Sequence, residues 1–162
     1  LTTVGYDVFS GTGLTSIEIP KNLQNISINS YSKMSFLSGI ASLTIVSFED
    51  GTTNIPDYAV AFASGVVTVI IPDSVTSIGD SAFYGCTSLA EINIPEGVVS
   101  VGAGALYGCS NLTEIVLPDT VTSIGGIAKI FKMFLSQTLS RKLMRTPLNV
   151  VQVLKILIFL MA

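Results

Sequence analysis

Apolar residues recur in a short fixed pattern along most of the chain, with one apolar residue followed by others three and five positions later. The pattern is clearest in residues 89–94, where Leu89, Ile92 and Ile94 are separated by other side chains. Because successive side chains of a strand point to opposite faces, this spacing predicts a short strand with one buried face. Pro95 follows directly and cannot donate a ladder hydrogen bond, so the strand is expected to end there.

This unit returns with a period of 23 residues, which separates Pro72 from Pro95, Pro95 from Pro118, and Cys86 from Cys109. A fixed period of this length is typical of repeat architectures. The same apolar pattern predicts five strands, near residues 14–19, 43–48, 66–71, 89–94 and 112–117. The first two lie 29 residues apart, so that coil carries six extra residues, which we place within 29–39.

The residues between two strands also have an inward-facing set. After Pro95, the apolar residues Val98, Val101, Ala105 and Leu106 are spaced to bring the chain back along the other side of the coil. One coil cannot bury its apolar side alone, whereas stacked coils share a continuous core. The sequence therefore predicts a repeat solenoid with 23-residue coils and short parallel strands on one face.

The frame I-P-x-x-V-x-x-I-G-x-x-A-F-x-x-C-x-x-L, best matched by residues 71–92 and 94–115, resembles the BspA-like leucine-rich repeats. The resemblance covers about residues 1–125. It implies a leucine-rich repeat fold and a cell-surface or secreted protein of the adhesion type. It also implies a host, matrix or cell-surface protein as the partner, no catalytic residues and no cofactor.

The outward residues of the predicted strands are the candidate binding surface, because solenoids usually bind through the concave face of their strand sheet. This surface is partly apolar and partly acidic, a combination that suits a protein partner. Ordinary surface filling of a β-sheet is the competing interpretation. The candidate residues are Ile45, Val67, Thr68, Ile70, Glu91, Asn93, Glu114 and Val116.

Two other functions are compatible with the same repeats. The coils could act as a structural spacer in a larger surface protein, which would be indifferent to changes on the strand surface. They could also form an intracellular repeat scaffold. A full-length gene that lacks any signal peptide would favour this scaffold.

Charge divides the chain at Gly126. Before this point lie Lys21, Lys33 and all eleven acids, whereas residues 127–162 contain six basic residues and no acid. Neighbouring parts of one domain seldom differ so completely. We therefore expect a solenoid in residues 1–126 and a separate basic, apolar tail in 127–162.

A shifted reading frame accounts for the tail. With permitted synonymous codons, reading across the codon boundaries of residues 127–162 restores the proline, valine, isoleucine, alanine–phenylalanine and cysteine positions of the repeat. The codons of Phe131, Phe134 and Phe159 force part of this agreement, because their first T becomes the middle base of a shifted codon, and a middle T always encodes an apolar residue. The competing interpretation is a genuine cap or membrane anchor. The apolar end, VVQVLKILIFLMA, is short for a span of roughly 20 residues and contains Lys155, so membrane contact is expected only if the tail is genuine.

Composition excludes several kinds of chemistry. The chain has no histidine, which rules out histidine triads and histidine metal sites. The acids do not follow the glycine-rich pattern of calcium-binding solenoids, and we interpret them as solvated turn and face residues. Two lysines before Gly126 do not suit nucleic acid, which requires clustered positive charge.

The two cysteines lie one coil apart, at Cys86 and Cys109. Strands in neighbouring coils are about 4.8 Å apart, so a disulfide is within reach. A pair of buried free thiols is the favoured interpretation, since free cysteine is among the most buried residue types.

Overall fold

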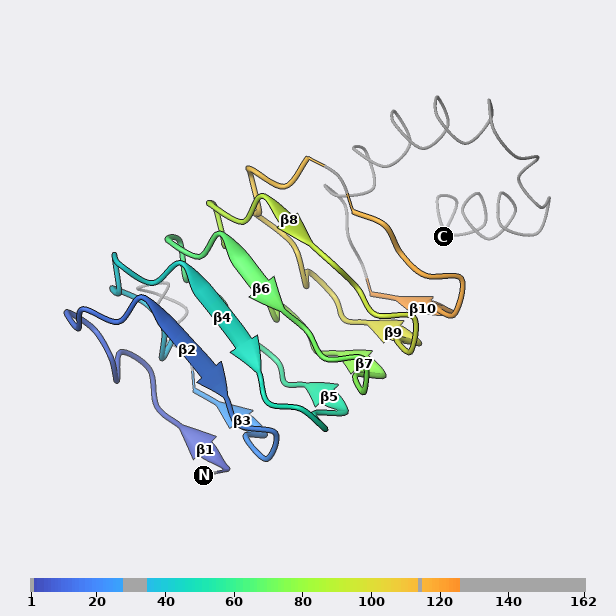
Figure 1. Cartoon of the computed structure of the whole chain (residues 1–162), viewed down its shortest axis with the longest axis horizontal. Coiled ribbons are helices and arrows are strands. Elements are labelled where there is room, and N and C mark those ends of the chain that lie inside the picture. Colours follow the sequence, from blue (N-terminus) through green and yellow to red (C-terminus); the bar gives the residue numbers. More distant parts are fainter. Residues whose placement is uncertain (1, 28–34, 114, 126–162) are drawn as a thin grey trace.

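The computed structural model describes residues 2–27, 35–113 and 115–125, which form stacked coils (Figure 1). The central coils contribute one strand to each of two four-stranded parallel sheets. The first sheet has the order β2-β4-β6-β8, with β2 Ser16–Ile19, β4 Ile45–Phe48, β6 Thr68–Ile70 and β8 Glu91–Ile92.

The second sheet lies on the return path of the coils and has the order β10-β9-β7-β5. Its strands have two residues each: β5 Asn54–Ile55, β7 Ser77–Ile78, β9 Ser100–Val101 and β10 Ser123–Ile124. At the N-terminal end, β1 (Thr3–Val4) pairs in parallel with β3 (Asn25–Ile26). The predicted parallel-strand solenoid is therefore confirmed.

The strand register reproduces the sequence period. Ile45 pairs with Thr68 and Thr68 with Glu91, so equivalent residues stand side by side in successive coils. Ser16 pairs with Ile45 rather than with a residue 23 positions later, which confirms the long coil. The predicted place of the extra residues, 29–39, lies mostly outside the described residues.

Four of the predicted strands are present, each within the predicted range. The fifth, near 112–117, consists of an isolated parallel bridge between Asn93 and Val116. The apolar pattern did not predict the second sheet, because a two-residue strand is too short to show a period. Strands β7 and β9 of this sheet end at Ile78 and Val101, the buried residues at the isoleucine position of V-x-x-I in the frame.

The core runs through the coils from end to end. On the strand side, Leu89, Ile92 and Ile94 are buried, as predicted. The return side is buried as well, at the four predicted positions Val98, Val101, Ala105 and Leu106. Phe83, the aromatic residue of the frame, is fully enclosed. Both predicted apolar sets thus face one shared interior.

Hydrogen bonds from coil to coil continue beyond the strands. In the segment around Phe83, its backbone N–H donates to the carbonyl of Ala105 at 2.8 Å. Two aspartates extend this network: the Asp57 carboxylate accepts from the N–H of Asp80 at 2.7 Å. The Asp80 carboxylate in turn accepts from the N–H of Ala103 at 2.7 Å. Each of these aspartates therefore joins its own coil to the next.

The glycine of the I-G pair permits this close stacking. A Cβ atom at Gly79 would lie 2.5 Å from the Asp57 Oδ1 atom. At Gly102 it would lie 2.5 Å from the backbone nitrogen of Asp80. Real Cβ atoms do not approach so closely, and so only glycine fits at this position of the coil.

Candidate functional site

The exposed side of the β2-β4-β6-β8 sheet, extended by the Asn93–Val116 bridge, is called the strand face below. Several apolar side chains are exposed on it, although apolar residues are usually buried. Their exposed fractions are 41% for Ile45, 42% for Val67, 54% for Ile70 and 72% for Val116. Repeated apolar exposure on one surface is typical of a contact surface.

Strand register brings the candidate residues together in rows. Ile45, Thr68 and Glu91 are consecutive cross-strand partners. Asn93 and Val116 are partners in a second row. Val67 lies just before β6, where its N–H donates to the Thr44 carbonyl at 2.9 Å. These residues form one surface; Glu114, the remaining candidate, lies outside the described residues.

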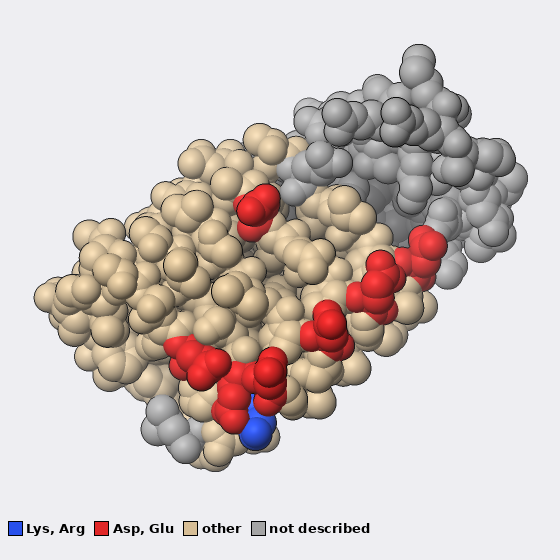
Figure 2. All heavy atoms as spheres, in the orientation of Figure 1, with Lys and Arg blue, Asp and Glu red and all other residues tan. Residues whose placement is uncertain are grey.

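A row of carboxylates borders the strand face where the strands end, and we call it the acidic rim. Figure 2 shows acidic side chains in line along this edge, in the orientation of Figure 1. By sequence, the rim consists of the residues that follow Glu49 and the three repeat prolines Pro72, Pro95 and Pro118, namely Asp50, Asp73, Glu96 and Asp119.

The sequence contains a signal for this rim, although its acids were interpreted one by one as solvated turn and face residues. The rim residues share the 23-residue period of the apolar positions, and three of them directly follow a proline. Read one at a time, Asp73, Glu96 and Asp119 look like ordinary solvated turn residues. Their alignment becomes evident only when the register of the coils is known.

Lys21 stands at the N-terminal end of the rim and is the one basic residue within 2–27, 35–113 and 115–125. Its Nζ atom lies 2.9 Å from a carboxylate oxygen of Glu49, and its backbone N–H also donates to Glu49 at 3.0 Å. The hydrogen bond between the two side chains raises the pKa of Lys21 and lowers the pKa of Glu49. The charge of Lys21 is thus matched by Glu49 of the next coil.

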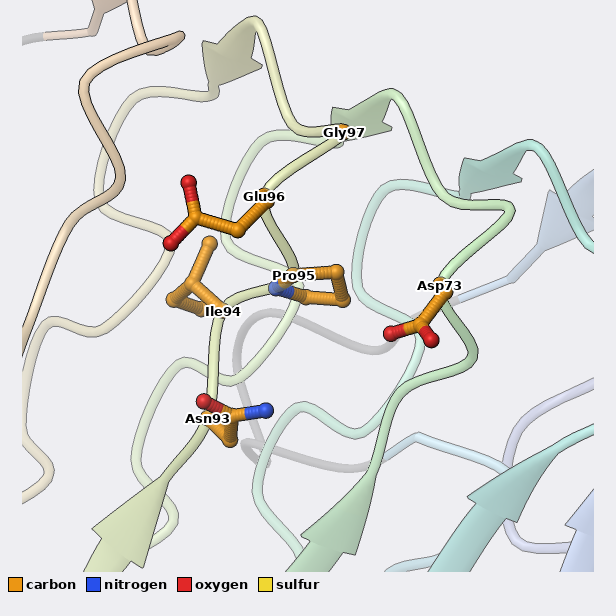
Figure 3. A pocket seen from close by; sticks show the side chains of 6 residues that line it. All are labelled: Asp73, Asn93, Ile94, Pro95, Glu96 and Gly97. Carbon is orange, nitrogen blue, oxygen red and sulfur yellow. The ribbon is translucent and has the colours of Figure 1, made fainter.

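A shallow depression of about 380 Å³ connects the rim with the strand face. Figure 3 shows the Asp73 carboxylate on one coil facing Pro95 and Asn93 on the next. The Glu96 carboxylate lies on the other side of Pro95. The walls of the depression are formed by Asp73, Asn93, Ile94, Pro95, Glu96 and Gly97.

The two cysteines are free thiols. The Cys86 thiol donates to the Val60 carbonyl at 3.1 Å, and the Cys109 thiol donates to the Phe83 carbonyl at 3.2 Å. Burial raises the pKa of both thiols, that of Cys109 to about 12. The structure agrees with the favoured interpretation of free thiols rather than a disulfide, although only Cys86 is buried and Cys109 is partly exposed.

A metal site and a membrane-spanning helix each place requirements on the described residues. Within 2–27, 35–113 and 115–125, no three histidine, cysteine or acidic side chains are grouped so that they could hold a metal ion. In the same part of the chain, no helix has the length and apolar character needed to cross a membrane.

Stacked coils of this period, with parallel strands and an exposed strand face, define a leucine-rich repeat solenoid. The chain belongs to the BspA type leucine-rich repeat family, whose model matches residues 2–137 in six copies. Members of this family, and proteins of this fold, are generally non-enzymatic repeat scaffolds that serve protein interaction. The match extends past Gly126, the boundary inferred from charge.

Two solved structures are similar to this chain. One is a leucine-rich repeat protein from T. pallidum, with 25% identity, a TM-score of 0.56, and coverage of 69% of this chain and 52% of that chain. The other is a leucine-rich cell surface protein from Faecalibacterium prausnitzii A2-165, with 32% identity, a TM-score of 0.50, and coverage of 80% of this chain and 40% of that chain. The chain thus spans about half the length of these relatives or less. No curated protein matches the sequence.

Proposed function

We propose that the chain is a protein-binding module of a larger cell-surface or secreted protein of the adhesion type, and that the strand face is its contact surface. The observation that carries this proposal is the exposure of Ile45, Val67, Ile70 and Val116 together on one sheet of a solenoid whose buried apolar residues form a continuous core. Burying these side chains against a partner would be favourable, at about 25 cal/mol per Å² of apolar surface removed from water.

The surface context rests on similarity. The F. prausnitzii relative is described as a cell surface protein and shares 32% identity with this chain. A host, matrix or cell-surface protein is the corresponding partner class. A solenoid presents many side chains on a rigid array, which suits recognition of a protein surface.

Two valines with similar exposure provide a matched test. Val67 is 42% exposed on the strand face, and Val99 is 46% exposed beside the second sheet. Substitution Val67→Glu places a charge among the apolar side chains of the contact surface. Val99→Glu makes the same chemical change outside it, and Ile70→Glu repeats the test on the strand face.

Binding would be measured on immobilised, purified matrix and cell-surface proteins, with thermal unfolding to establish that each variant is folded. We expect Val67→Glu and Ile70→Glu to weaken binding by roughly tenfold or more, as for a truncated contact residue, while Val99→Glu binds like the unmodified chain. Equal binding by all four proteins would contradict a contact role for the strand face and would favour a spacer.

A further inference from the structure

The strand face and the acidic rim together have a pronounced charge asymmetry. Glu18 and Glu91 are exposed on the strands, and Asp50, Asp73 and Glu96 follow one another along the edge. No basic side chain lies among the described residues of the sheet, and Lys21, at the end of the rim, is matched by Glu49. The surface therefore combines exposed apolar groups with a uniformly negative electrostatic potential.

The register of the coils places the rim residues at equivalent backbone positions, one coil after another. Equivalent positions in neighbouring coils are separated by about the spacing of adjacent strands, 4.8 Å. Like charges along one edge repel one another. A cation placed between two coils would relieve this repulsion, whereas an anionic partner would increase it.

We propose that the strand face binds a basic protein segment, in which apolar side chains are flanked by lysine or arginine. This inference rests on the proposed function and specifies the chemistry of the partner. The apolar residues of the segment pack on Val67, Ile70 and Val116. Its basic side chains extend over the strand ends to the acidic rim.

The depression between Asp73 and Asn93 locates one of these contacts. It opens where the strand face meets the rim, so an extended basic side chain can lay its methylenes along Pro95 and place its charge beside Asp73 (Figure 3). Lysine and arginine combine an apolar stem with a charged end. The stem matches Pro95 and the charged end matches the Asp73 carboxylate. The Asn93 amide oxygen can accept a hydrogen bond from the same group.

Charge complementarity of this kind acts mainly on specificity and association rate. Segments with the same apolar residues but acidic flanks are rejected by the rim. Because the rim is exposed, binding should weaken with salt: the screening length falls from about 10 Å at 0.1 M to about 3 Å at 1 M.

The experiment is a selection from a phage library of random peptides on the immobilised full chain, followed by affinity measurements with the enriched peptides. The rim variant is Asp73→Asn with Glu96→Gln, which raises the net charge by two units without changing side-chain size. Its control is Thr53→Lys with Val99→Lys, which raises the net charge equally at exposed positions beside the second sheet. Val67→Glu tests the strand face.

We expect enriched peptides to carry lysine or arginine next to apolar residues and to bind the rim variant roughly tenfold more weakly, with the control unchanged. Enriched peptides without a basic bias that are lost with Val67→Glu but unaffected by the rim variant would overturn this inference and leave the proposed function standing. Failure to enrich any peptide, or enrichment insensitive to both variants, would overturn both.

Discussion

At the scale of single residues, the repeat is most demanding where one coil touches the next. Gly79 and Gly102 occupy the same position in successive coils, and a side chain at either would overlap with the preceding coil. The frame shows this glycine in the sequence but not its reason, because the apolar pattern describes one coil and the contact belongs to two. Its role therefore had to come from the structure.

Gly102→Ala should destabilise the solenoid by about 1–3 kcal/mol, the usual cost of forcing an extra group into a closely packed site. Gly13→Ala is the matched control, because a Cβ atom there would have no heavy atom within 4 Å. Urea unfolding of both variants measures the difference, and we expect Gly13→Ala to stay within about 0.5 kcal/mol of the unmodified chain. Equal stability of the two variants would contradict the close contact.

The thiols of Cys86, which is buried, and Cys109, which is partly buried, should be unreactive in the folded protein. Burial raises the pKa of Cys109 to about 12 and also that of Cys86, so both remain protonated at pH 8 and lack the nucleophilic thiolate. Ellman's reagent should react with neither cysteine before denaturation and with both afterwards. Rapid reaction in the folded state would show an accessible thiolate. If neither cysteine reacted after denaturation without a reducing agent, the two cysteines would be joined in a disulfide.

At the scale of elements, the sequence predicted the long strands well and missed the short ones. The inward residues Leu89, Ile92 and Ile94 repeat often enough to define strands near the observed ranges. The two-residue strands of the second sheet have no period of their own, and they form because stacking aligns their backbones. The candidate strand face followed from the same alternation, whereas the acidic rim needed the register of several coils.

The Lys21–Glu49 pair links the ends of β2 and β4, and its contribution to stability should depend on pH. The lowered pKa of Glu49 means that its stabilising effect is complete above the ordinary carboxyl value of 4.5 and is lost as the pH falls through the folded value. The raised pKa of Lys21 has the opposite sense, so its effect is present below 10.5 and is lost as the pH rises through the folded value.

Glu49→Gln is the corresponding variant. At pH 7 it should unfold at a lower urea concentration than the unmodified chain, and this difference should shrink as the pH falls below 4.5. Unfolding curves recorded across this pH range provide the measurement. A difference that stays constant through the acid range would show that the pair contributes nothing through its charge.

At the scale of the whole molecule, the coils from β2 to β10 form one stack. The domain boundary at Gly126, inferred from the abrupt change in charge, remains a prediction from the sequence alone. We propose that residues 127–162 are an out-of-frame reading of further repeats. The fold could be predicted because the same signal occurs several times. The partner could not, since the repeat specifies the surface and not what binds to it.

Sequencing of the gene and transcript across the codons for Gly125 to Ala128 tests this proposal. We expect about thirteen additional nucleotides there, the number that would restore the repeat spacing and the reading frame. The printed reading in both gene and transcript would contradict the frameshift. A genuine basic tail would then be the alternative.

Because the register is constant from coil to coil, adding or removing whole coils changes the length of the solenoid in fixed steps. A gene that duplicates or deletes one whole repeat changes the length of the strand face by about 4.8 Å, and every remaining side chain keeps its neighbours in line. Such a change alters how long a partner the surface can hold without redesigning any coil. Recombination between repeats is therefore a direct way for related chains to acquire different reach while keeping the same local contacts.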